Sequence, residues 1–312
     1  MRITSNAIFH QLTADINRAA TRLFERQRQV ASTKRMAAAS DDPIGAGLAV
    51  SLRETLAQLL QAQRNGDLAE NKLEASQGVL TDIFSVLGDV KDLARRGVDG
   101  NMSNADRQDL ATQVNQMLEQ LLSDANARSI DGYLFGGTQT TVAPFTGSYA
   151  AGELTGVTAN SSGTGIAGQV EAEIPGGLRV VANVPGSTVF SLTLPLPPPD
   201  QDVDIFRQLI NVRDNLRTGN VANVEAELTN IDTAVDQVRV VMADVGSRIG
   251  RIRDIQQRSQ SDLLTIKSRL SRIEDTDIAE AAIELQQAQI VYQAALSSAS
   301  KGMQVSLVDF LL

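Results

Sequence analysis

Apolar residues recur at alternating steps of three and four along both ends of this chain of 312 residues. One long run covers residues 52–94, and a second covers residues 221–273. This seven-residue period is typical of helices that pack lengthwise against one another. At a rise of about 1.5 Å per residue, the helix that carries the first run would be about 65 to 75 Å long. The pattern therefore predicts a mainly α fold, an elongated antiparallel bundle of long coiled-coil helices formed by both chain ends.

Polar and acidic residues mark the start of two predicted helices. A first helix is expected over residues 3–38, and Ser40 is expected to act as N-cap of the next helix, with Pro43 at an early helical position. Side-chain oxygens satisfy free amides at a helix start, and carboxylates there interact favourably with the helix dipole. A last helix is expected to follow Asp277. Its predicted seam runs through Ile278, Ala282, Leu285, Gln289, Tyr292, Leu296, Ala299, Met303, Ser306 and Phe310. The predicted capping signature comprises Ser40, Asp41, Asp42, Glu274 and Asp275.

The middle of the chain has a different composition. Residues 136–202 are rich in Gly, Pro and Thr and contain two alternating stretches, residues 177–182 and residues 188–194. Alternation with a period of two is typical of strands, and the prolines of residues 195–199 favour an extended connection. We therefore expect a small β-rich insertion domain between the two helical halves.

These patterns divide the chain into three predicted parts. The expected parts are terminal helices (1–40 plus 275–312), a long-helix bundle (41–135 plus 203–274) and a β-rich insertion (136–202). Packing the N-terminal helices antiparallel to the C-terminal ones buries both seams and brings the two chain ends together.

Composition argues against several classes of partner. The formal net charge is -9, and the sequence pI is about 4.8, whereas binding of nucleic acid needs a basic surface. The chain has no Cys, which removes disulfides and thiolate chemistry. No run of apolar residues is long enough for a membrane span, and no signal-peptide core precedes the first helix. We expect no nucleic-acid partner, no membrane span and export, if any, without a cleaved signal.

Residues suited to catalysis are sparse. His10 is the only histidine, and its helical neighbours one turn away offer no second catalytic or ligating group. The glycines of residues 132–138 follow a helix, whereas a phosphate-binding loop lies between a strand and a helix and commonly brings a Lys. The basic run of residues 248–272 is interleaved with acidic residues, as on a solvated or intersubunit face. We therefore expect no enzyme activity, no cofactor and no metal site.

Apolar stripes at both termini need a covering surface. A hairpin of two helices rich in Ala and Gln would leave outer residues such as Ile290 exposed to solvent. Packing between subunits is favoured over a self-contained hairpin, although the hairpin remains an alternative. The predicted interface residues are Phe9, Leu12, Ile16, Leu23, Leu285, Tyr292, Leu296, Met303, Leu307, Phe310 and Leu311.

Two stretches near the ends of the chain resemble the flagellin family. Residues 34–36 (KRM) with 40–47 (SDDPIGAG) resemble its N-terminal signature, and residues 271–277 (SRIEDTD) resemble its C-terminal one. Within the family, residues 133–138 (YLFGGT), 292–296 (YQAAL) and 307–311 (LVDFL) are similar to members found at the junction of hook and filament. One departure is Thr33, which stands where the family commonly has Gly and so puts the geometry of the first helix joint in question.

The resemblance implies a structural role in the bacterial flagellum. The chain would leave the cytoplasm through the flagellar type III apparatus and assemble outside the cell as a ring of its own copies. That ring would join the hook, through a neighbouring hook-associated protein, to flagellin in the filament. The resemblance also implies an export chaperone for the C-terminal helix. The alternatives are a filament-forming flagellin and, outside this family, a cytoplasmic coiled-coil scaffold.

Overall fold

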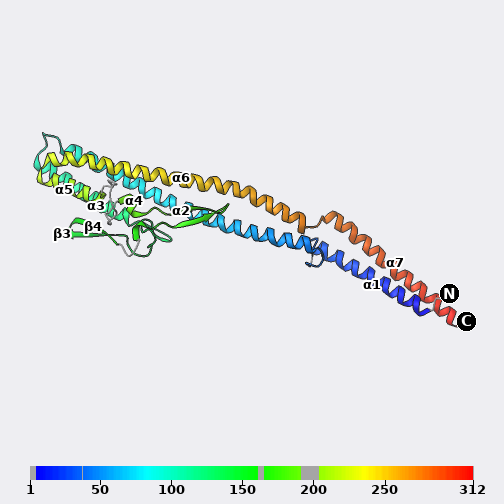
Figure 1. Cartoon of the computed structure of the whole chain (residues 1–312). Helices are drawn as coiled ribbons and strands as arrows, with labels where there is room; N and C mark the ends of the chain where they lie inside the picture. Colours follow the sequence, from blue (N-terminus) through cyan, green and yellow to red (C-terminus); the bar gives the residue numbers. More distant parts are fainter. Residues whose placement is uncertain (1–4, 37, 161–164, 191–203, 312) are drawn as a thin grey trace. The chain divides into compact units, whose positions relative to one another are not determined.

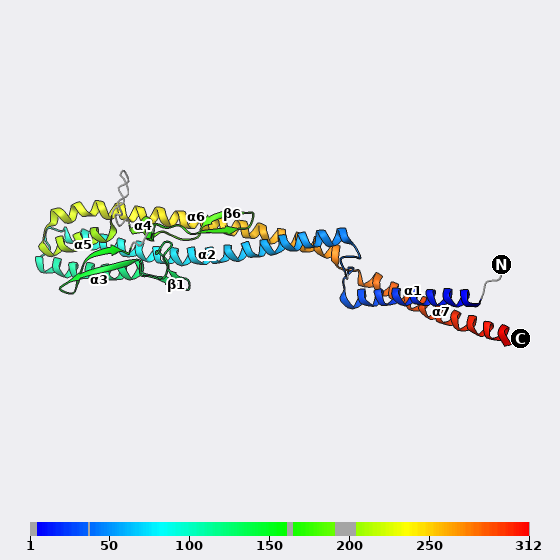
Figure 2. The ribbon, with the colours of Figure 1, turned by 60° about the horizontal axis from the view of Figure 1, so that its bottom comes forward.

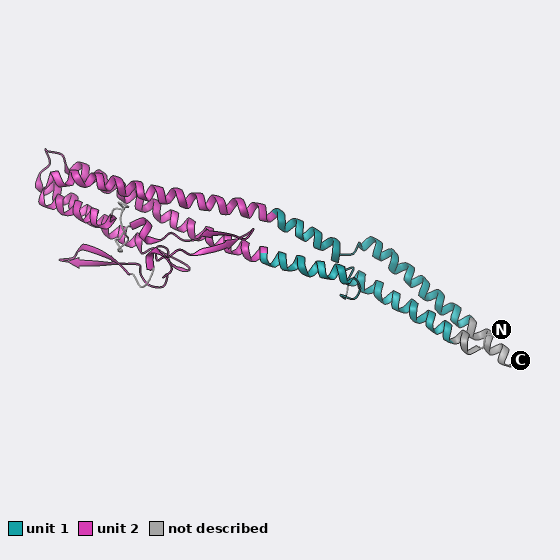
Figure 3. Cartoon of the chain, viewed as in Figure 1, with its two compact units in different colours: residues 1–58, 261–312 teal, residues 59–260 magenta. Residues whose placement is uncertain are grey.

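The computed structural model describes residues 5–36, 38–160, 165–190 and 204–311, and it forms two compact units (Figure 3). Unit 1 comprises residues 1–58 and 261–312, and unit 2 comprises residues 59–260. Side chains are described for residues 10–36, 38–160, 165–190 and 204–301. The boundary between the units falls within two long helices, so the predicted division into three parts remains a prediction.

Long helices come from both ends of the chain, as the seven-residue period predicts (Figure 1). The helices of the described residues are α1 (Ser5–Ser32), α2 (Pro43–Gly97), α3 (Asn104–Ala125), α4 (Gly186–Phe190), α5 (Ile205–Thr218), α6 (Val221–Glu274) and α7 (Ile278–Leu311). Helices α2 and α6 have 55 and 54 residues, which is long enough for the heptad runs that predicted them. The mainly α fold class is confirmed.

The strands form three separate hairpins in unit 2. They pair as β1 (Arg128–Ser129) with β2 (Gly132–Tyr133), β3 (Phe145–Ala150) with β4 (Glu153–Ala159), and β5 (Glu171–Ile174) with β6 (Leu178–Val181). Every pair is antiparallel, and β3 and β4 change register between Ser148 and Tyr149. A small insertion with short antiparallel strands is therefore present, and β6 confirms the strand predicted over residues 177–182.

The second predicted strand, over residues 188–194, is wrong where the structure describes it. Residues 186–190 form the short helix α4, which begins with a turn in which the Thr188 amide donates to the Pro185 carbonyl. The helical turn buries both Val189 and Phe190, whereas alternation would have buried only one of two neighbours. Packing demand therefore overrides the β propensity of this stretch, and residues 191–194 and the proline tract lie outside the described residues.

Helices α2 and α6 run antiparallel through unit 2, and cross-helix ion pairs record their register. Lys91 of α2 pairs with Asp232 of α6, and further along, Glu70 lies 2.5 Å from Arg253. Beside these helices, four aromatic rings form one cluster in which neighbouring centroids are 4.8 to 6.1 Å apart. The rings belong to Phe135, Phe145, Phe190 and Phe206. Half of the eight Phe residues of the chain thus anchor the insertion to the helices.

Candidate assembly interface

Helices α1 and α7 of unit 1 lie side by side, and small residues fill the seam between them (Figure 2). Ala19 of α1 and Ala281 and Ala299 of α7 are the buried apolar residues of the pair among the described side chains. Small side chains let two helix backbones approach closely, but each buries little apolar area. The seam is therefore narrow and contributes only modest stability to an isolated pair.

Larger apolar residues lie on the outside of the same pair. Phe24 on α1 is 68% exposed, and Ile283 and Ile290 on α7 are 60% and 58% exposed. Other exposed apolar residues of α7 are Ile278, Val291 and Leu296. Full burial of one such side chain contributes about 1.5 to 3 kcal/mol, so a surface that covered these side chains would lower the free energy of the protein in water. The arrangement is the reverse of an ordinary helical hairpin, which buries its large apolar residues.

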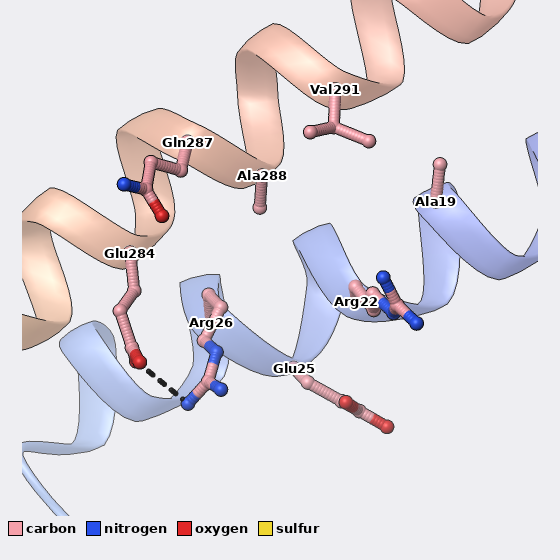
Figure 4. Close-up of a pocket in the computed structure, with 8 residues that line it drawn as sticks. All are labelled: Ala19, Arg22, Glu25, Arg26, Glu284, Gln287, Ala288 and Val291. Atoms are coloured by element: carbon pink, nitrogen blue, oxygen red, sulfur yellow. Dashed lines mark ion pairs between the residues drawn. The ribbon is translucent and has the colours of Figure 1, made fainter.

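A shallow hollow of about 340 Å³ opens between α1 and α7 (Figure 4). Its walls comprise Ala19, Arg22, Glu25, Arg26, Glu284, Gln287, Ala288 and Val291. Arg26 and Glu284 form an ion pair of 2.9 Å across one end of the hollow, and both side chains remain more than one-third exposed. An apolar floor with a charged rim is suited to a side chain of another protein.

The structure places the predicted interface residues in three groups. Leu12, Ile16, Leu23, Leu285 and Tyr292 are half-buried, and Leu296 is exposed. Phe9, Met303, Leu307, Phe310 and Leu311 lie outside the residues whose side chains are described. The predicted interface omits Phe24, Ile283 and Val291, although the seven-residue spacing of Ile283 and Ile290 marks a second apolar stripe on α7.

The predicted seam of α7 needs a correction. Ile278, Ala282, Gln289 and Leu296 were expected on the seam, but they are exposed. The seam instead follows Ala281, Leu285, Ala288, Tyr292, Ala295 and Ala299. Because α7 carries apolar residues on more than one face, its sequence pattern did not determine which stripe faces α1. Close packing against α1 selects the face with alanines.

Helix α1 ends at Ser32, earlier than the predicted residue 38, because the chain turns at Thr33. Thr33 has φ of 56°, in the left-handed region that a β-branched residue rarely adopts. The Thr33 carbonyl accepts a hydrogen bond from the Thr276 amide, and the Arg35 amide donates to the Glu274 carbonyl at 2.7 Å. Backbone hydrogen bonds therefore join the turn that follows α1 to the turn that precedes α7.

Ion pairs reinforce this joint around Glu274. The Glu274 side chain is 7% exposed and lies 3.3 Å from Lys34 Nζ and 2.8 Å from Arg53 Nη2. The Arg53 contact is an ion pair without hydrogen-bond alignment, because Glu274 Oε1 has no hydrogen-bond partner. Lys34 also donates to Asp275 at 2.5 Å, and this hydrogen bond lowers the pKa of Asp275 and raises the pKa of Lys34. A hollow of about 260 Å³ opens beside the joint.

The capping roles differ from those expected. Asp42, not Ser40, caps α2, since its Oδ1 accepts the Gly45 amide at 2.9 Å and Pro43 is the first helical residue. Asp277 caps α7 through the Ala279 amide at 2.8 Å. Glu274 and Asp275 make the ion pairs of the joint and cap neither helix, and Asp41 accepts the Ala38 amide in the preceding turn. The predicted capping signature therefore lies at the joint, and within it Asp42 is the residue that caps a helix. The cap of α7 is Asp277, which the signature did not include.

The terminal pair carries side chains suited to packing against another protein. In the described part of the chain, no group of three or more His, Asp or Glu side chains is placed to hold a metal ion. None of the described helices combines the length and the apolar character that a bilayer crossing requires. What the surface does offer is exposed aliphatic side chains, alanines and paired charges.

Both ends of the chain match helical regions of a known protein family. The bacterial flagellin N-terminal helical region matches residues 3–140, and the bacterial flagellin C-terminal helical region matches residues 228–311. Together the two matches cover more than two-thirds of the sequence. This chain belongs to the flagellin family.

Individual relatives show which members of that family this chain resembles. The flagellar hook-associated protein 3 of Salmonella typhimurium is 26% identical over 294 residues, which is 89% of each chain. Among solved structures, the flagellar junction protein FlgL of Legionella pneumophila has a TM-score of 0.57 at 16% identity, covering 73% of this chain and 100% of its own. FlgL of Xanthomonas campestris has a TM-score of 0.59 at 16% identity, covering 70% and 99%. At these identities the solved structures show a shared fold.

Proposed function

We propose that this chain is a structural subunit of the bacterial flagellum that assembles as a ring where the hook meets the filament. The observation that carries the proposal is the inverted packing of the terminal pair, which buries alanines and exposes Phe24, Ile283 and Ile290. Neighbouring copies that cover these side chains would gain the burial energy that the isolated chain lacks. Similarity to hook-associated protein 3 over 89% of both chains supports the junction over the filament as the place of assembly.

In this role the terminal helices make the subunit contacts and the insertion faces outward. The predicted residues Leu12, Ile16, Leu23, Leu285, Tyr292 and Leu296 would join the exposed side chains in that interface. Partners would be further copies of this chain, a neighbouring hook-associated protein and flagellin. The role requires no catalysis, cofactor or metal.

Before assembly, the exposed apolar residues of α7 need protection. An export chaperone that binds α7 as a helix in a groove would cover them in the cytoplasm. The chain would then pass through the flagellar type III apparatus and reach its place outside the cell. Binding of a chaperone to the same face that later contacts a neighbour would prevent premature assembly.

Immunolabelling of isolated flagella tests the proposed position. Antibodies raised against residues 140–195 are applied to flagella and imaged by electron microscopy. We expect one labelled band where hook meets filament. Label along the whole filament would indicate a filament-forming flagellin, and absence of label from the flagella would favour a cytoplasmic coiled-coil scaffold; either result would reject the proposal.

A further inference from the structure

A third hollow, of about 460 Å³, lies in unit 2 between the β5–β6 hairpin and one face of α6. Figure 2 shows this hairpin alongside α6. The lining consists of Leu178, Ser247, Gly250, Arg251, Asp254, Ile255 and Arg258. Arg251 and Arg258 are exposed and seven residues apart, about two helical turns. Neither makes an ion pair within the described part of the chain.

These two arginines are set in an acidic unit. Unit 1 contains as many Lys and Arg as Asp and Glu, so residues 59–260 carry the whole net charge of -9. On the same helix, Arg248 is paired with Asp244, and Arg253 is paired with Glu70 and Glu74. Arg251 and Arg258 are thus the cations of this segment left to attract a carboxylate from outside the chain, with Asp254 between them.

A matching acidic face lies on α2. Asp82 and Asp89 are exposed and also seven residues apart, and Ser85 lies between them on the same face. Burial is the larger cause that raises the pKa of Asp124 on α3, and the charge of Asp82 raises that pKa further. The effect of Asp82 indicates repulsion between carboxylates at this face. A cation from a neighbouring molecule would relieve that repulsion.

Glycines on both faces permit close approach. At Gly78 on α2 and Gly250 on α6, an added Cβ would meet no atom of this chain within 4 Å. Glycine inside a helix is less stable than alanine, and nothing within the chain requires it at these two positions. A helix from outside that packs against these faces would use the missing side chains.

We propose that the α2 face of one copy, with Asp82, Ser85 and Asp89, docks against the α6 face of the next copy, with Gly250, Arg251 and Arg258. In the antiparallel register of α2 and α6, Asp82 meets Arg258 and Asp89 meets Arg251, with Ser85 and Asp254 between the two pairs. Within one copy, the ion pairs Lys91–Asp232 and Glu70–Arg253 set Asp82 level with residue 241, roughly 17 residues from Arg258. Contacts between these two faces therefore move each copy by about 25 Å along the bundle and propagate as a helically staggered assembly. This inference rests on the proposed assembly role and names its lateral contact in unit 2.

A charge-swap experiment tests the pairing in flagellated cells. One variant carries Arg251→Asp and Arg258→Asp, a second carries Asp82→Arg and Asp89→Arg, and a third carries all four changes. We measure the amount of full-length protein in purified flagella relative to the amount secreted. Each double variant is expected to lose incorporation by about tenfold or more, because like charges then face each other. The fourfold variant is expected to recover most of it, because every pair is complementary again.

Several controls keep the experiment decisive. The fourfold variant has the net charge of the natural chain, which separates pairing from total charge. Circular dichroism of each purified variant checks its helix content, and if a reversal unfolds the protein, Arg251→Gln with Arg258→Gln replaces it. Normal incorporation of both double variants, or no recovery in the fourfold variant, would overturn the docking while the proposed function stands. Absence of the natural protein from flagella would overturn both.

Discussion

Thr33 is the residue whose backbone conformation most clearly conflicts with its side chain. A non-glycine residue in the left-handed region is destabilised by about 1 to 2 kcal/mol. We predict that Thr33→Gly will stabilise the joint of unit 1 by about 0.5 to 1 kcal/mol, because relief of strain exceeds the added entropy of the unfolded chain. Hydrogen exchange of amides in α1 and α7 measures the change.

The matched control is the neighbouring Ser32→Gly. Ser32 is the last residue of α1 and needs no positive φ, so glycine there should weaken the helix end. Faster exchange in both variants would show that strain at Thr33 is not the dominant effect.

Glu274 is the residue on which the cations of the joint converge. We predict that Glu274→Gln will destabilise unit 1 by about 1 to 2 kcal/mol, because Lys34 and Arg53 lose their shared carboxylate. The loss stays below that of a fully buried pair, since both cations are half exposed and remain hydrated. Glu284→Gln, which removes a surface pair with Arg26, should change stability by less than about 0.5 kcal/mol. Equal effects in hydrogen exchange would contradict a special role for Glu274.

The Lys34–Asp275 pair makes the joint dependent on pH. Because its hydrogen bond to Lys34 lowers the pKa of Asp275 in the folded state, its stabilisation is complete above the unfolded pKa of about 3.9 and is lost as pH falls through the folded value. The raised pKa of Lys34 keeps the pair charged up to alkaline pH. We predict that Asp275→Asn lowers the unfolding midpoint at pH 7 and that the difference shrinks progressively as pH falls below about 3.9. A difference that stays the same size over that pH range would argue against the ion pair.

At the scale of single elements, α3 has the most complete cap. Ser103 Oγ accepts the Asp106 amide, and the Asp106 carboxylate accepts the Ser103 amide, which together form a capping box. We predict that Ser103→Ala destabilises unit 2 by about 1 kcal/mol, measured by urea unfolding followed by circular dichroism. Ser123→Ala, on the exposed face of the same helix, should be neutral. A loss at Ser123 as large as that at Ser103 would refute the capping argument.

The elements also show where pattern alone was ambiguous. Pro43 predicted the start of α2 closely, because the fixed backbone of proline suits the first helical turn and acts within that turn. The inward face of α7 was not predictable in the same way, because its apolar residues occupy more than one stripe. Which stripe faces inward depends on the partner helix, and the partner here selects Ala281 and Ala299 over Ile278 and Leu296.

At the scale of the whole molecule, the two units differ in the side chains that each buries in its own core. Unit 2 has a continuous core of buried Leu, Ile, Val and Phe, whereas α1 and α7 bury mainly alanines among the described side chains. We predict that deletion of residues 278–312 leaves the helical signal and cooperative unfolding of residues 59–260 intact but abolishes incorporation into flagella. Circular dichroism and immunoblots of purified flagella test the two halves of this prediction. Normal incorporation of the truncated chain would reject the terminal helices as the assembly interface.

The sequence by itself determined the long helices, their approximate ends and the small β-rich insertion. It did so because heptad spacing, prolines and caps act over a few neighbouring residues. The signatures around Lys34 and Asp275 also identified the family, because each signature is a short continuous stretch of sequence.

Only the tertiary structure decided how those local pieces are used. It turned residues 186–190 into a helix and brought Glu274 to Lys34 and Arg53 across more than 200 residues of sequence. It also turned the larger side chains of α7 outward. These outcomes depend on contacts between distant segments, whose free energies no local pattern contains, and they are the features on which the proposed assembly depends.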